Sequence, residues 1–164
     1  MEIIMKQTGE VRVAESLEKA GYRATHLYPV LRLIAKDMMR VEGELFISQG
    51  RRGGGSWKRL RPSTVRQKGN TTILYDTGDL FRSLTRFRAQ FQVLNFDTQN
   101  GVELGTDRPW AYVHQYGDDR TPQHVPKREF LRVRDRDVEK WSAWLMEYLM
   151  AAFEENETPL PEEL

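Results

Sequence analysis

The stretch WSAWLMEYLMAAF, residues 141–153, is apolar almost throughout. Only Ser142 and Glu147 are polar, so eleven of its thirteen positions are apolar or aromatic. We expect it to form the end of a last helix that runs from about residue 134 to residue 153. A helix that is apolar on every side is normally buried on every side, but a small domain hides only one face of a terminal helix against its own sheet. The other face therefore needs a second cover, from this chain or from another.

Apolar spacing predicts a second long helix, roughly residues 28–47. Its inward positions recur at intervals of three and four, which is the helical period; they are Leu27, Leu31, Ile34, Met38, Val41 and Leu45. Pro29 fits in the first turn, where the missing N–H is least costly.

The remaining elements follow from glycines, prolines and changes of period. Before the sheet, we expect a helix at 13–21 closed by Gly21, a flexible loop at 49–56, a short helix at 61–69, an extended run at 71–75 and a helix at 76–87 capped by Asp76 or Thr77. Two strands, near 87–94 and 101–106, are joined at Asn100–Gly101. A short helix at 107–117, with a strand as the alternative, and a polar loop at 118–128, with a short edge strand as the alternative, follow. The predicted fold class is therefore α+β, with N-terminal helices, a small antiparallel sheet with a hairpin and a long C-terminal helix.

Charge is distributed unevenly along a chain of 164 residues with a net charge of only +1. Residues 51–68 hold seven basic residues and no acidic one, whereas residues 154–164 hold five Glu and no basic one. Segregation of this kind suggests docking surfaces. We expect one domain over 1–153, followed by an acidic, disordered segment, 154–164.

Several chemistries have no support in the sequence. Without cysteine there are no disulfides, thiolate zinc sites or thiol nucleophiles. His26, His114 and His124 lack metal-binding spacing, and the glycines at 53–55 lack the signature of a phosphate loop. Asp76 and Asp79 suit helix capping better than acid/base catalysis. With no secretion signal or membrane span apparent, we expect a soluble intracellular protein that is not an enzyme and needs no metal or cofactor.

Residues 51–68 allow two interpretations. Arginine, lysine and glycine around Trp57 are typical of an arm that contacts nucleic-acid phosphates, with Trp57 stacking on a base. Alternatively, the loop is solvated and Trp57 anchors it in the core. The near-neutral net charge disfavours a dedicated DNA-binding protein.

The last helix predicts self-association or docking on a partner. Exposed apolar patches usually mark interaction surfaces, and interface cores favour aromatic residues and Met. The acidic segment could meet the basic loop of a neighbouring copy, a head-to-tail contact that can close into a ring. The predicted interface residues are Arg51, Arg52, Trp57, Lys58, Arg59, Arg61, Trp141, Trp144, Tyr148 and Phe153.

Five motifs together resemble the phage virion morphogenesis, or tail-completion, family of Mu-like and related tailed phages. They are WKRLRPSTVRQKG (57–69), ILYDTGDLFRSL (73–84), VELGT (102–106), AYVHQYG (111–117) and VPKREFL (125–131). Each motif alone is weak, but order and spacing also match over about residues 25–153. The residues that match are Leu74, Thr77, Gly78, Leu80, Tyr112, His114, Gln115, Gly117, Pro126, Arg128, Phe130 and Leu131. The step Val125-Pro126-Lys127 departs from the Ile-Pro-Ala type usual in the family.

The resemblance implies a structural protein of the virion neck, with the matching residues holding the fold and subunit contacts. Related neck proteins form rings, commonly hexameric, between the head connector and the tail tube. The implied partners are further copies of the chain and other neck and tail proteins, with DNA as a candidate occupant of the ring lumen and no membrane. The expected location is the head–tail junction of the virion, and the host cytoplasm during assembly.

Overall fold

The computed structural model describes residues 9–97, 101–120 and 124–153, with side chains from residue 14 onward. Its elements are α1 (Gly9–Thr25), α2 (Tyr28–Ile47), a 3-10 turn η1 (Arg51–Gly53), α3 (Pro62–Lys68), α4 (Asp79–Thr85), β1 (Gln92–Asp97), β2 (Gly101–Thr106), α5 (Ala111–Tyr116) and α6 (Asp135–Met150). This arrangement confirms the α+β fold class.

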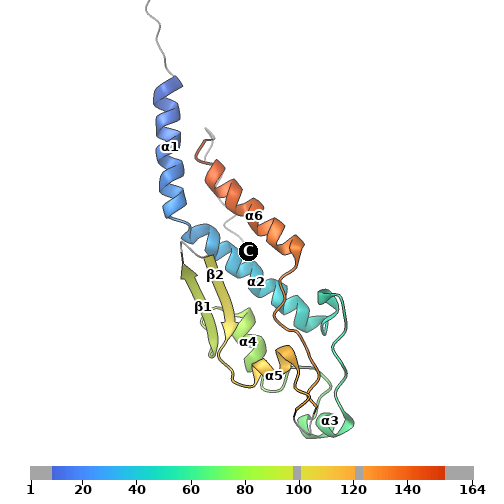
Figure 1. Cartoon of the computed structure of the whole chain (residues 1–164). Coiled ribbons are helices and arrows are strands. Elements are labelled where there is room, and N and C mark those ends of the chain that lie inside the picture. The colour runs from blue at the N-terminus through green and yellow to red at the C-terminus, as the bar shows by residue number, and fades with distance from the viewer. Residues whose placement is uncertain (1–8, 98–100, 121–123, 154–164) are drawn as a thin grey trace, which may run out of the picture.

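Helix α2 is the centre of an elongated molecule (Figure 1). The two-stranded sheet and α4 pack along it, and α6 packs on another side. Helices α1 and α6 project side by side past the start of α2, while α3 lies beyond its other end. The sequence predicted that the last helix would pack on the sheet, but α6 packs mainly on α2 and α1.

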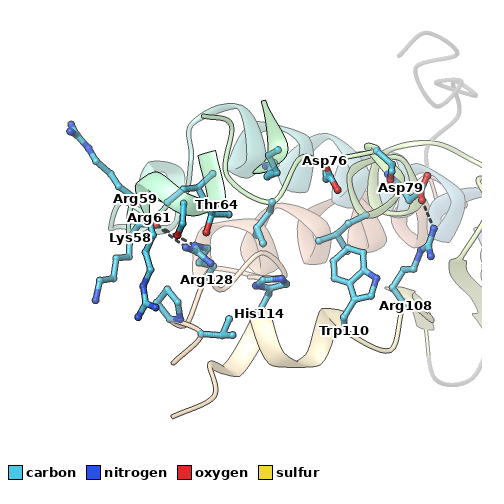
Figure 2. Close-up of a pocket in the computed structure, with 18 of the residues that line it drawn as sticks. Lys58, Arg59, Arg61, Thr64, Asp76, Asp79, Arg108, Trp110, His114 and Arg128 are labelled. Atoms are coloured by element: carbon cyan, nitrogen blue, oxygen red, sulfur yellow. Dashed lines mark hydrogen bonds and ion pairs between the residues drawn. The ribbon is translucent and has the colours of Figure 1, made fainter. Parts of the chain in front are cut away.

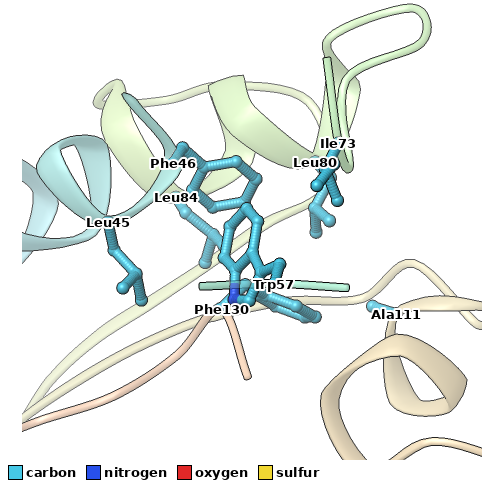
Figure 3. Packing of buried hydrophobic residues seen from close by; sticks show 8 residues of the cluster. All are labelled: Leu45, Phe46, Trp57, Ile73, Leu80, Leu84, Ala111 and Phe130. Atoms are coloured by element: carbon cyan, nitrogen blue, oxygen red, sulfur yellow. The ribbon is translucent and has the colours of Figure 1, made fainter. Parts of the chain in front are cut away.

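Two apolar clusters lie at different ends of α2. Near its start, Val30, Leu31 and Ile34 pack with residues of the sheet and of α6. Near its end, Leu45 and Phe46 meet a second cluster, which Figure 3 shows. Its other members are Trp57, Ile73, Leu80, Leu84, Ala111 and Phe130. The bounds predicted for this helix, 28–47, are confirmed.

The first helix is longer than predicted. Gly21 was expected to end it, but α1 continues to Thr25. Gly21 is exposed and has no neighbour within 4 Å of a would-be Cβ, so it sits in an ordinary solvent-facing turn of the helix. A glycine inside a helix costs only about 1 kcal/mol relative to alanine. The break comes instead at His26 and Leu27, because Pro29 has no N–H to offer the carbonyl of Thr25 and its ring would clash with that carbonyl in a continuous helix.

The first strand was placed too early. The chain at residues 86–91 turns instead, with φ of 58° at Arg88 and 67° at Phe91, and β1 begins at Gln92. The partly buried side chains are Leu94 and Phe96 while Val93 is exposed, which is the opposite alternation to the predicted one. The antiparallel pairing from Gln92↔Thr106 to Asp97↔Gly101 confirms the hairpin. The rest of its turn lies outside the described residues, and residues 71–75 form no strand.

The short helices follow the sequence closely. Helix α3 ends at Gly69 as predicted, with a left-handed φ of 73°. Helix α5 confirms the helical interpretation of residues 107–117 and excludes the strand. Helix α4 is shorter than predicted, and its N-cap is Gly78, not Asp76 or Thr77. The hydroxyl oxygen of Thr77 nevertheless accepts a hydrogen bond from the backbone N–H of Asp79, the first helical residue, at 3.4 Å. Asp79 lies in the first turn as expected.

The loop after α2 packs closely on the core at Gly50, where there is no room for a side chain. Gly50 has a φ of 88°, and a Cβ there would lie 2.5 Å from Cδ1 of Trp57. Gly54 has a similar φ, 91°, but nothing within 4 Å. We expect Gly50→Ala to lower the free energy of unfolding by about 1–3 kcal/mol more than Gly54→Ala, because only the first adds a steric clash to the shared backbone strain. Chemical denaturation of both variants measures this difference. Equal losses would mean that Trp57 moves away freely.

Candidate functional site

The inward face of α6 is held on α2 and α1 by polar contacts as well as apolar packing. Asp37 on α2 is 3% exposed. Its carboxylate accepts a hydrogen bond from Nε1 of Trp141 at 2.7 Å and also pairs with Lys140 and Arg40. Hydrogen bonds from these three residues lower the pKa of Asp37 although burial alone would raise it. Farther along α6, the Tyr148 hydroxyl donates to the carbonyl of His26 at 2.7 Å.

These contacts place three predicted interface residues inside the chain's own packing. Trp141, Trp144 and Tyr148 are half-buried against the cluster at the start of α2. Lys140 also lies over the Trp144 ring, with Nζ 4.7 Å from its centroid. The sequence therefore overestimated how much of the large aromatic surface is left for a partner.

The outward side of α6 nevertheless carries exposed apolar side chains, which we call the α6 outer face. They are Met146 and Met150 within α6 and Phe153 just after its end, exposed by 56%, 50% and 46% respectively. Met146 and Met150 are one turn apart on the same side of the helix. Of the aromatic residues predicted for an interface, Phe153 is the exposed one.

A charged cluster joins the end of α2, the turn η1 and the start of α6. Asp137 is 4% exposed and accepts hydrogen bonds from Arg52 and Arg134. Burial disfavours the charged carboxylate, but these arginines outweigh burial and lower the pKa of Asp137 to about 2. Arg52 also pairs with Glu44. Arg52 therefore holds elements of its own chain together.

Glu42 is the neutral partner in this cluster. It is 3% exposed, and burial raises its pKa to about 8 against the opposing effect of a backbone hydrogen bond from Arg132. The nearby Asp137 carboxylate raises it further. Asp137 and Glu42 thus both lie near Arg52 and Arg134, and near neutral pH Asp137 is ionised while Glu42 is protonated.

The basic loop separates into an anchor and a free part. Trp57 is 8% exposed, donates from Nε1 to the carbonyl of Glu129 at 3.1 Å and packs edge-on against Phe46. This is the anchored arrangement that the sequence allowed as an alternative to stacking on a base. Arg51 is exposed and donates from Nε to the carbonyl of Ser48.

Four basic residues of 51–68 line a cavity of about 630 Å³ between α3, α4 and α5; they are Lys58, Arg59, Arg61 and Lys68. Figure 2 shows Lys58, Arg59 and Arg61 gathered at one end together with Arg128. The first three are exposed, and within the described residues no carboxylate pairs with any of them. The apolar part of the lining comes from Leu60, Leu74, Leu80, Trp110, Val125 and Pro126.

Arg128 is a buried cation with which no carboxylate of the described residues forms an ion pair. It is 6% exposed, and its Nε and Nη2 both donate to the carbonyl of Lys58 at 3.2 Å. Among the residues that the structure describes, no carboxylate lies within ion-pair distance of this guanidinium. Burial lowers the pKa of Arg128. An unpaired buried charge is costly, so this end of the cavity favours an anion.

The opposite end of the cavity is electrically balanced. Asp79 pairs with Arg82 at 2.7 Å and with Arg108, and Arg108 in turn lies over the ring of Phe91, 3.4 Å from its centroid. Between the two ends lies His114, whose buried Nδ1 finds no hydrogen-bond partner among the residues that the structure describes. Burial and the positive charges of Arg128 and Lys68 lower the pKa of His114, so the ring is neutral near pH 7.

The motif residues that carried the family resemblance meet at this cavity. Gln115 fastens two motifs together: its Oε1 accepts from the backbone N–H groups of Phe130 and Leu131, and its Nε2 donates to the carbonyl of Leu131 at 2.9 Å. Arg128 N donates to His114 O at 2.7 Å. Seven motif residues line the cavity, namely Leu74, Thr77, Gly78, Leu80, His114, Pro126 and Arg128. The family resemblance implied that Arg128 helps to hold the fold and subunit contacts, but Arg128 was not among the predicted interface residues.

Other kinds of site find no support in the described part of the chain. Residues 9–97, 101–120 and 124–153 contain no group of three or more His, Asp or Glu that could hold a metal ion. Within the same ranges, every helix is too short or too polar to span a bilayer.

The structure is an α+β fold with two candidate interaction surfaces, the α6 outer face and the cavity between α3, α4 and α5. The model of the phage virion morphogenesis family matches residues 10–150. The chain belongs to this family, which confirms the resemblance and gives the protein a structural role in phage morphogenesis. Neither the curated proteins nor the solved structures gave a match.

Proposed function

We propose that this protein is a non-enzymatic component of the head–tail junction of a tailed phage, where it completes the tail and joins it to the head. It acts as a ring of identical copies, hexameric as in related neck proteins, with other neck and tail proteins as neighbours and DNA in the lumen. In this proposal the protein assembles in the host cytoplasm and then resides in the virion.

The α6 outer face is the observation that carries self-association. Met146 and Met150 are each about half exposed on a helix whose other side is already packed, and Phe153, just after the end of the helix, is exposed to a similar degree. Contiguous exposed apolar side chains usually mark interaction surfaces, and Met and aromatic residues are enriched in interface cores. Because α6 projects beyond the sheet beside α1 (Figure 1), this face is open to a second copy.

Substitution of the two methionines tests the proposal. Native mass measurements over a concentration series should show oligomers for the natural chain. We expect Met146→Glu with Met150→Glu to weaken association at least about tenfold, because two charges would have to be desolvated in the interface. Circular dichroism should be unchanged, since both side chains face solvent.

Ile47→Glu is the matched control, because Ile47 is 77% exposed and apolar but lies at the end of α2. It should leave the oligomer intact. A natural chain that remains a single copy at every concentration, alone and with phage tails, would contradict the proposal. Equal weakening by Ile47→Glu would remove the specific role of α6.

A further inference from the structure

We infer that the cavity between α3, α4 and α5 binds the acidic segment 154–164 of a second copy of this chain. The inference deepens the proposed function and rests on its self-association. It assigns the carboxylates of that segment to the cavity end formed by Lys58, Arg59, Arg61 and Arg128.

The requirement for an anion comes from Arg128. Its guanidinium has five N–H donors, and the described residues offer it one acceptor, the carbonyl of Lys58. Nη1 makes no hydrogen bond within the described residues. A carboxylate at this position would supply the missing negative charge and accept charge-assisted hydrogen bonds. The three exposed cations at the rim would hold further carboxylates.

The shape and lining of the cavity favour a peptide over nucleic acid. About 630 Å³ enclosed between helices suits a small ligand or a few peptide residues, but not a duplex. Part of the cavity wall is apolar, because Leu60 and Leu74 line it together with Trp110, which is 42% exposed. Aromatic walls of this kind accept proline-containing extended peptides.

Residues 154–164 match both parts of this lining. The sequence EENETPLPEEL carries five Glu and no basic residue. Its Pro159-Leu160-Pro161 step is followed directly by Glu162 and Glu163. One short segment therefore brings an apolar portion for Trp110 and adjacent carboxylates for the basic end.

The geometry of the fold directs the segment to another copy. It follows α6, whose end lies beside the start of α2, because Tyr148 bonds the carbonyl of His26. Residues of α3 line the cavity, and α3 lies past the opposite end of α2 (Figure 1). Helix α2 has 20 residues and so spans ~30 Å, whereas eleven residues reach at most ~40 Å when fully extended. To reach the cavity of its own copy, the segment 154–164 would need nearly its full extended length to cover the distance. The cavity of a neighbouring copy is therefore the better-placed site.

A contact from one end of a copy to the other end of the next is heterologous. Such contacts repeat in one direction and close into a ring when the rotation between copies allows it. The charged segment and the cavity would thereby supply the directional part of the assembly, while the α6 outer face supplies apolar area.

A labelled peptide of residues 154–164 tests the cavity directly. The receptor is the full chain in which Glu154, Glu155, Glu157, Glu162 and Glu163 are replaced by Gln, so that no segment of the receptor competes. We expect Lys58→Ala, Arg59→Ala and Arg61→Ala together to weaken peptide binding at least about tenfold. All three side chains are exposed, so folding should be preserved. Arg51→Ala, Arg86→Ala and Arg136→Ala together remove equal charge outside the cavity and should leave binding unchanged.

Mixing two variants tests whether the contact joins different copies. One chain carries the three cavity substitutions and keeps its acidic segment; the other carries the five Gln substitutions and keeps its cavity. With Met146→Glu and Met150→Glu in both, contacts through α6 are removed. Native mass should show a 1:1 complex in the mixture and single copies for each chain alone.

The outcomes separate this inference from the proposed function. Absence of peptide binding, or equal binding by the cavity and control variants, overturns the inference, even if the natural chain forms oligomers through α6. Peptide binding without a 1:1 complex overturns the assignment to a second copy. Tighter binding of a single-stranded oligonucleotide, with the same dependence on Lys58, Arg59 and Arg61, overturns it in favour of nucleic acid. A natural chain that never associates contradicts the proposed function whatever the peptide does.

Discussion

Trp57→Ala should lower the free energy of unfolding by about 3–5 kcal/mol, the usual loss when a buried large aromatic residue is truncated. Trp57 is 8% exposed and packs between Phe46 and the chain near Phe130. The substitution would also leave the carbonyl of Glu129 without the indole N–H that it accepts at 3.1 Å. Thermal or chemical denaturation measures the loss, and the basic loop is expected to lose its attachment at the same time.

Two further variants make this result specific. Trp57→Phe keeps a ring in the core and loses the hydrogen bond, so it should cost less, about 1–2 kcal/mol. Tyr112→Ala removes an aromatic ring that is 64% exposed and should change stability by no more than about 0.5 kcal/mol. A loss below about 1 kcal/mol for Trp57→Ala, together with a change in particle mass, would show that Trp57 serves an interface and not the core.

Glu42→Gln should change how stability depends on pH. The folded-state pKa of Glu42 is about 8, above its ordinary value of 4.5. Between these values the unfolded chain has released the proton that the folded chain still holds, so ionisation favours unfolding and stability falls as pH rises. Each pKa unit corresponds to ~1.4 kcal/mol, so the stability of Glu42→Gln relative to the natural chain should rise by roughly 4 kcal/mol from pH 4.5 to 8 and then level off.

Denaturation of both proteins across this pH range checks the expectation. The comparison cancels Asp137, whose lowered pKa, about 2, gives stability that is present above its unfolded value and lost as pH falls toward 2. Glu139→Gln, at an exposed position of α6, should shift stability by at most about 0.5 kcal/mol. A constant difference between natural chain and Glu42→Gln would mean that Arg52 and Arg134 accommodate a charged Glu42.

The sequence predicted the helices well because their signals are local. The apolar spacing of 28–47 and the glycine after α3 each depend on a few neighbouring residues, and both held. The first strand was misplaced because the alternation of Phe87, Ala89 and Phe91 lies in a segment that turns, and strand pairing begins only at Gln92. The register of a strand is set by its partner, and the partner here is opposite Gln92–Asp97.

The candidate surfaces were predicted only in part, because burial depends on contacts between distant residues. The apolar excess on α6 was visible in the sequence, but not that Asp37 on α2 would draw Trp141 inward. Segregated charge marked residues 51–68 as a docking surface. The sequence did not reveal that Arg128 is buried, since its contacts come from Lys58 and from His114 of α5, which are distant along the chain. The available signal was an arginine two residues after a proline in a short motif.

Asp37 has a mechanical consequence for the last helix. Apolar contacts alone would let a helix slide or rotate on the helix beneath it, because one methyl group replaces another at little cost. The Asp37 carboxylate pairs with Lys140 and accepts a hydrogen bond from the indole N–H of Trp141, which fixes the rotation of α6 about its axis. Any other rotation would leave the buried Asp37 carboxylate without these partners. Met146 and Met150, on the other side of α6, therefore keep a constant orientation relative to the rest of the chain, as the proposed symmetric assembly requires.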